Sequence, residues 1–164
     1  MLSQLAAHLG LPRTHNGQVL SCLLVTSTLF STLAVGLAAP AAGFWQMFLS
    51  LIAGSFLVIH HVTLVCLLRK HSSGAPYVHN VLTRKKNIGF LVLFEAMVIS
   101  AVGVGLYFYI WLHDSTDDYY PALALVSTLF ALFEAIILGI LILYCLVARR
   151  EKLMGAQGLD ETGL

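Results

Sequence analysis

Four long apolar runs constrain the fold of this chain more than any other feature of its sequence. They cover about residues 19–39, 44–68, 88–112 and 122–148. A helix needs about 20 mostly apolar residues to cross a bilayer, and each run reaches that length. Because hydrocarbon offers no partner to backbone N–H and C=O groups, each run is predicted to be a helix. The expected fold class is therefore all-α, an integral membrane four-helix bundle.

The composition agrees with a lipid environment. Of the 164 residues, 59% are hydrophobic and 10% are charged, whereas a soluble domain has about 25% charged residues. A domain of this size buries only about two-thirds of its potential surface, so water would meet too many apolar side chains. The net charge of +1 and the absence of a basic stripe argue against a nucleic-acid partner.

The connections between the runs predict the topology. Pro40 and Gly43 in the sequence "APAAG" separate the first two runs and favour a tight turn. Pro121 suits the first turn of the fourth helix, where no N–H is needed. Short connections make consecutive helices antiparallel, and an up-down-up-down bundle over 19–148 is expected.

The two ends of the chain are expected to lie outside the bilayer. Residues 1–18 carry Leu2, Leu5, Ala6 and Leu9 at helical spacing, which fits either a helix on the membrane surface or a frayed terminus. Residues 149–164 begin with basic side chains and are expected to continue as a flexible tail.

The basic residues predict the orientation. All nine fall on one side of the four-span arrangement: Arg13, Arg69, Lys70, Arg84, Lys85, Lys86, Arg149, Arg150 and Lys152. Cytosolic loops are enriched in Lys and Arg, so both termini and the loop between the second and third spans are expected in the cytosol. The cluster Arg69, Lys70, Arg84, Lys85 and Lys86 is a candidate site for anionic lipid. A cleavable signal peptide over residues 1–41 is an alternative for the first run.

Four ionisable residues lie inside the predicted spans: His60, His61, Glu95 and Glu134. Such residues are costly in lipid and usually face partners in the bundle interior. His60 precedes Arg69 by nine residues and Glu95 follows Lys86 by nine, so both lie about 13 Å from the basic charges. A contact from His60 or His61 to Glu95 is therefore expected.

Glu134 is predicted to lie about 9 Å deeper, because it precedes Arg149 by fifteen residues. The first run carries the other polar stripe, formed by Ser27, Thr28, Ser31 and Thr32. We expect a protonated Glu134 whose O–H is bonded to that stripe, since a buried charge is the more costly state.

Three functions fit these residues. The first is a non-enzymatic membrane-organising or accessory protein, in which the four ionisable residues only fix helix packing. The second is a proton-coupled transporter working as an oligomer, with Glu134 or Glu95 as the proton site. The third is an intramembrane isomerase or cyclase on a lipid or terpenoid, with His60 or His61 and Glu95 as base and acid. A homo-oligomer or another membrane protein is a candidate partner.

The sequence shows no metal-binding, cofactor-binding or disulfide motif. Adjacent histidines on a helix diverge by about 100°, so His60 and His61 do not form a chelating pair, and no metal or cofactor is expected. Cys22, Cys66 and Cys145 lie near the cytosolic ends of their helices, where disulfides are not expected. These cysteines are either S-palmitoylated or simply small apolar side chains.

The span layout of residues 19–148 resembles that of small MARVEL-like tetraspan membrane proteins. The resemblance implies four spans, cytosolic termini and modest loops. The outer connection "PAAG" is shorter than is usual in those proteins, and the resemblance assigns no residue a role.

Overall fold

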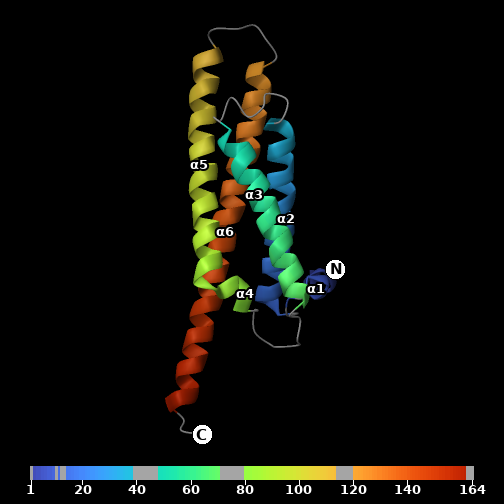
Figure 1. The fold of residues 1–164 in the computed structure, drawn as a ribbon, viewed down its shortest axis with the longest axis vertical. Helices are drawn as coiled ribbons and strands as arrows, with labels where there is room; N and C mark the ends of the chain where they lie inside the picture. Colours follow the sequence, from blue (N-terminus) through green and yellow to red (C-terminus); the bar gives the residue numbers. More distant parts are fainter. Residues whose placement is uncertain are drawn as a thin grey trace.

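The structure, a computed structural model, describes residues 2–9, 11, 14–38, 48–70, 80–113 and 120–161. Its elements are α1 (Leu2–His8), α2 (His15–Ala38), α3 (Leu49–Lys70), α4 (Asn80–Thr83), α5 (Lys85–His113) and α6 (Tyr120–Glu161). The described part of the chain contains no strand, and its four long helices run side by side as a bundle (Figure 1). The predicted all-α four-helix fold is confirmed.

The surface of the bundle is apolar. Within the described residues, four stretches are long and apolar enough to cross a bilayer: His15–Leu37, Leu49–Lys70, Lys85–Trp111 and Leu125–Arg150. Only 33% to 39% of the most apolar window in each is buried, so most of these side chains face outward. Large exposed examples include Ile59, Ile99 and Leu143. An apolar surface of this extent calls for lipid rather than water around it, and the chain is accordingly a membrane protein.

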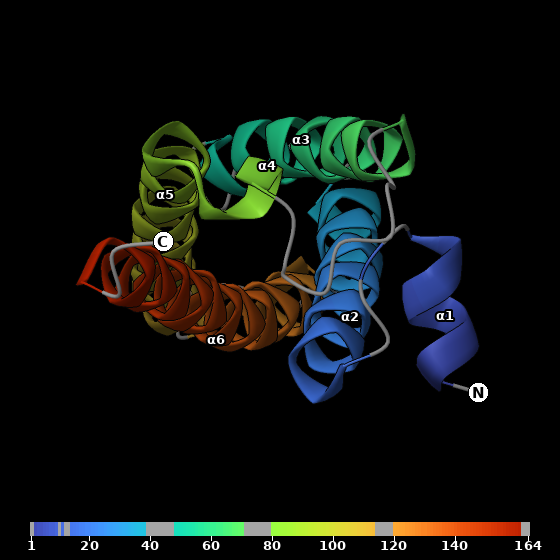
Figure 2. The same cartoon turned by 90° about the horizontal axis from the view of Figure 1, so that it is seen from below.

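The four long helices occupy the corners of a square in the order α2, α3, α5, α6, and each packs on its two neighbours (Figure 2). Helix α1 lies outside the square against α2, and the short α4 lies across one end. Figure 1 shows α1 and the C-terminal end of α6 at the same end of the bundle. We call this end, which also carries Arg69, Lys70, Arg84, Lys85 and Lys86, the basic end.

Two apolar clusters fill the interior. The larger cluster lies towards the basic end and is rich in leucine, including Leu24, Leu64 and Leu138. The smaller cluster lies towards the other end and is built from Ala53, Val98, Val102, Ala131 and Ala135. These short side chains allow the helices to approach closely, as is common where membrane helices pack.

Helices α2 and α3 approach each other closely at Gly54. A Cβ atom added there would lie 2.5 Å from Val35 Cγ2 and 3.5 Å from the carbonyl oxygen of Ser31. A methyl group cannot fit into that space without displacing Val35. Gly54 is therefore a packing residue that sets the distance between these two helices.

The helix ends differ in places from those expected. Helix α3 begins at Leu49 and not near residue 44, and Phe48 before it has a left-handed φ of 62°. Helix α6 continues to Glu161, through most of the segment 149–164 that was expected to be a basic end followed by a flexible tail. The sequence "REKLM" that follows Arg149 consists of good helix formers, which explains the continuation as far as residue 154. The predicted turn at Pro40 and Gly43 lies outside the described residues.

The N-terminal segment forms the helix α1, which packs against α2. Its apolar side chains Ala6, Leu9 and Leu11 pack into the larger cluster of the bundle and do not rest on the membrane surface alone. The Nε–H of Arg69 in α3 donates a hydrogen bond of 2.9 Å to the carbonyl oxygen of His8. Helix α1 is thus bound to the bundle through both α2 and α3.

Candidate functional site

A buried carboxyl group links α6 to α2. The Oε1 atom of Glu134 accepts hydrogen bonds from Ser27 Oγ at 2.6 Å and from Ser31 Oγ at 2.9 Å. All three residues are almost completely buried, with Glu134 2% exposed. Ser27 and Ser31 are one helical turn apart, and therefore both hydroxyls face α6 at the level of Glu134.

The predicted contact between Glu134 and the hydroxyl stripe of the first span is confirmed, with one difference. The two serine hydroxyls are the donors and Oε1 is the acceptor, whereas we expected the carboxyl group to donate. The other oxygen, Oε2, is buried and has no hydrogen-bond partner among the described residues. Thr28 and Thr32 do not bind Glu134, because their hydroxyls donate to the backbone carbonyls of Leu24 and Thr28, each at 2.7 Å.

His61 lies in the wall between α2 and α3 and is 1% exposed. Its Nδ1 atom is 3.4 Å from Thr28 Oγ1, and the Thr28 hydroxyl already gives its proton to Leu24. In the neutral tautomer that carries its proton on Nδ1, His61 donates to Thr28 in this contact, and Nε2 is then an acceptor. No group of the described structure donates to Nε2, which is buried.

His60 points to a different helix from His61, as expected for adjacent positions on a helix. Its Nε2 lies 2.8 Å from Asn87 Oδ1, and the Asn87 amide group donates to the carbonyl oxygen of Leu82 at 3.0 Å. Asn87 therefore accepts from His60 and joins α3, α4 and the first turn of α5. The ring of His60 also packs on Phe90 and Phe94, with centroid distances of 6.1 Å and 5.8 Å.

We expected a contact between a histidine and Glu95. Among the described residues, this prediction is wrong. Asn87, Phe90 and Phe94 recur at helical spacing and form the face of α5 that meets His60. Glu95 is one position further on, about 100° away, and faces α6. A Cβ atom added to Gly139 of α6 would lie 3.5 Å from Glu95 Oε1. The depth of Glu95 was estimated from helical rise, but its direction was not fixed by that estimate.

A groove of about 460 Å³ lies between α2 and α3. Leu24, Thr28 and Leu29 line it on α2, and Val62, Val65 and Arg69 line it on α3. His61 is part of its wall, whereas Glu95 and Glu134 are not. The groove is open to the outside of the bundle, since Leu29 and Val62 are more than half exposed. Of the four candidate residues, it reaches only His61.

The three cysteines differ in exposure. Cys22 and Cys66 are exposed and Cys145 is buried, and all three are free thiols. Cys66 also lines the groove, and Cys22 does not. Within the described residues, no three His, Cys, Asp or Glu side chains gather closely enough to hold a metal ion.

Asn87 and Arg69 make contacts that the sequence did not predict. Asn87 follows the basic run "RKK" at the start of a span, a position where a polar residue attracts no attention. Arg69 was interpreted as a basic charge and as part of a candidate anionic-lipid site, although its side chain also holds α1. No protein-family model, no curated protein and no solved structure matches this chain.

Proposed function

We propose that this chain is a non-enzymatic integral membrane protein that acts in membrane organisation or as an accessory subunit of a membrane complex. The main support is the environment of Glu134. Its Oε1 binds two serines of another helix, the residue is buried, and the groove does not reach it. A polar side chain in this position joins helices and fixes their rotation and register.

An isomerase or cyclase has less support. Such an enzyme needs an acid and a base that face the same bound substrate. Here His60 is bonded to Asn87, His61 lies in the α2–α3 wall, and Glu95 faces Gly139 of α6. The candidate acid and bases are thus directed at three different neighbours.

A proton-coupled transporter is the second candidate. It is favoured by three buried polar atoms that lack hydrogen-bond partners in the described part of the chain: His61 Nε2, Glu95 Oε2 and Glu134 Oε2. Such atoms are rare in packed interiors and mark places where a proton or a water molecule is able to bind. They come from α3, α5 and α6, so a proton relay through the bundle would use three of its four helices.

We also propose that the basic end faces the cytosol, with both termini on that side. This orientation follows from the position of all nine Lys and Arg residues relative to the four spans. The same layout supports the likeness to MARVEL-like tetraspan proteins, which concerns the arrangement of the spans and not any specific residue.

Reconstitution into liposomes separates the first proposal from the second. The full chain is placed in vesicles that contain a trapped pH-sensitive dye, and a pH gradient is applied with a potassium ionophore to balance charge. We expect the same proton leak in protein-free vesicles, in the wild type, in Glu134→Gln and in Glu95→Gln. A leak that the wild type adds and that either substitution removes would overturn the proposal in favour of the transporter.

A further inference from the structure

We propose that the α2–α3 groove binds an acyl chain of an anionic phospholipid, with the lipid phosphate on the guanidinium group of Arg69. The inference uses the groove and its charged end and not the role of Glu134. It depends on the membrane location of the chain, and its test therefore fails or succeeds independently of the proton-leak experiment.

The groove has the length and the volume for part of a lipid tail. Arg69 and His61 are eight residues apart on α3, which gives about 12 Å along the helix axis. Its 460 Å³ lies within the range of about 300–1,000 Å³ that is usual for small-molecule sites. The groove ends on the basic side of the Gly54–Val35 contact, where α2 and α3 meet closely.

The groove presents a mainly apolar surface to a bound ligand, even where its side chains carry hydroxyl groups. Thr28 and Thr32 both line the groove, but each hydroxyl donates to a carbonyl of its own helix. His61 is 1% exposed, so its ring contributes little polar surface to the opening. What remains for a ligand is mainly the aliphatic surface of leucine and valine, together with the threonine methyl groups.

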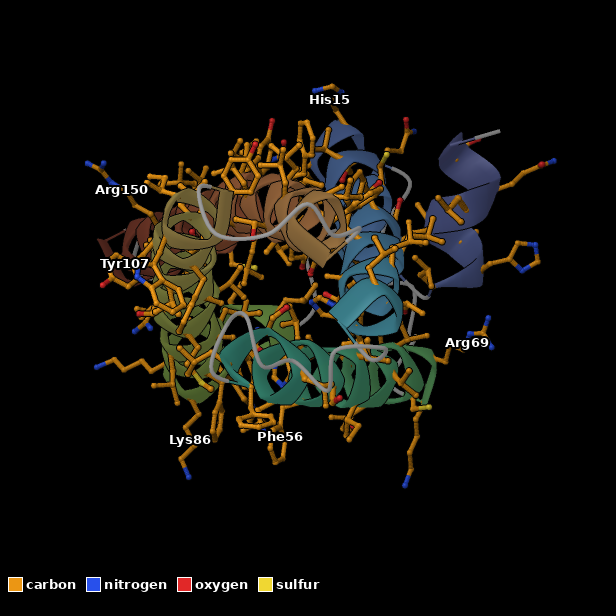
Figure 3. The ribbon with its side chains drawn as sticks, turned by 90° about the horizontal axis from the view of Figure 1, so that it is seen from above. His15, Phe56, Arg69, Lys86, Tyr107 and Arg150 are labelled. Atoms are coloured by element: carbon orange, nitrogen blue, oxygen red, sulfur yellow. The ribbon has the colours of Figure 1, made fainter. Side chains whose placement is uncertain are left out.

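The positive end of the groove favours a negative head group. The Nε–H of Arg69 donates to the His8 carbonyl, which orients the guanidinium, and its terminal N–H groups have no acceptor among the described residues. A guanidinium fork matches a phosphate group. Arg69, Lys86 and Arg150 extend outward on different sides of the bundle (Figure 3), so the surrounding potential also attracts anionic lipid. A cation at one end of an apolar groove is complementary to an amphiphile with one anionic end.

Alkylation of Cys66 measures whether the groove is occupied, and alkylation of Cys22 and Cys145 provides internal controls. Cys66 is exposed and lines the groove, Cys22 is exposed outside it, and Cys145 is buried. The full chain, purified in an uncharged detergent, is treated with N-ethylmaleimide, and each cysteine is quantified by mass spectrometry. Dioleoyl phosphatidic acid is added at increasing concentration, and dioleoyl phosphatidylcholine is added in parallel.

We expect phosphatidic acid at ten times its dissociation constant to slow alkylation of Cys66 about tenfold, the ratio set by site occupancy. Alkylation of Cys22 should not change, and phosphatidylcholine should have a much smaller effect on Cys66. Arg69→Gln should remove the difference between the two lipids. Lys70→Gln, a matched loss of one charge at the neighbouring exposed position outside the groove lining, should keep it.

Further outcomes would overturn the inference. These are equal protection by the two lipids, equal protection by inorganic phosphate, and loss of the effect in Lys70→Gln to the same degree as in Arg69→Gln. If Arg69→Gln exposes Cys145 to alkylation, the bundle has opened, and Val62→Phe then takes its place. Val62→Phe fills the exposed side of the groove without a change of charge, and it should also weaken protection by phosphatidic acid. Unchanged protection in Val62→Phe would contradict the proposed site.

Discussion

The contact of Glu134 with Ser27 and Ser31 makes a prediction whose size and sign both follow from the structure. In the double variant Ser27→Ala, Ser31→Ala, the Glu134 carboxyl stays buried and loses both donors. Interhelical hydrogen bonds in membranes are worth about 0.6 kcal/mol on average, and up to about 1.7 kcal/mol. A buried polar group left without partners costs about 1–3 kcal/mol. The double variant should therefore be destabilised by about 1–3 kcal/mol.

The reverse change should cost less. In Glu134→Leu, each serine hydroxyl is able to donate to a carbonyl of its own helix, as Ser21 does to Gln18 at 2.7 Å. The triple variant, which combines Glu134→Leu with the two serine-to-alanine substitutions, should recover most of the stability that the double variant loses. Replacement of both partners by apolar groups is often close to neutral.

The assay is equilibrium unfolding of the purified chain in mixed micelles with a rising mole fraction of SDS, followed by the loss of helix circular dichroism. The free energy of unfolding is compared among the wild type, the double variant, Glu134→Leu and the triple variant. An unchanged double variant would refute the reasoning. A triple variant that is as unstable as the double variant would refute it as well.

Three further predictions concern other parts of the chain. Gly54→Ala should destabilise the bundle by about 1–3 kcal/mol through overpacking against Val35. Val35→Ala in the same chain should restore part of the loss in the same unfolding assay. Equal losses with and without Val35→Ala would contradict the close approach. Asn87→Ala should cost more than His60→Ala, because Asn87 makes two hydrogen bonds and His60 makes one of them; the opposite order would contradict the assignment. Residues 1–41 should remain in the mature chain because α2 supplies the donors to Glu134; an intact mass of the purified protein that lacks them would show cleavage.

Hydrophobic length was sufficient to predict the four spanning helices of this fold. Each span was identified from its run of apolar residues, because lipid leaves the helix as the only structure for a single segment. Depth was also accessible, since the rise of about 1.5 Å per residue places Glu134 relative to the basic end. That estimate put Glu134 beside the hydroxyl stripe of α2, where Ser27 and Ser31 bind it.

The rotation of each helix about its axis could not be predicted from the sequence in the same way. Membrane helices that are apolar all round show no single buried stripe, and packing rather than hydropathy decides which side faces a neighbour. Glu95 faces Gly139 and not a histidine, and His60 meets Asn87 instead. The α2–α3 groove depends on the same rotations, so its lining was also not predictable from the sequence.

The most direct test of the account is the sidedness of two of the loops that join the spans, the one after α3 and the one after α5. Cys22, Cys66 and Cys145 are replaced by alanine, and single cysteines are introduced as Ser72→Cys or Ser115→Cys. Intact and permeabilised cells are then treated with a membrane-impermeant maleimide; if the chain remains in an internal membrane, sealed vesicles of that membrane are used in the same way. Four spans with a cytosolic basic end predict that the cysteine at position 72 is labelled from the cytosolic side only, and the cysteine at position 115 from the opposite side only. Labelling of both positions from the same side would contradict the four-span bundle.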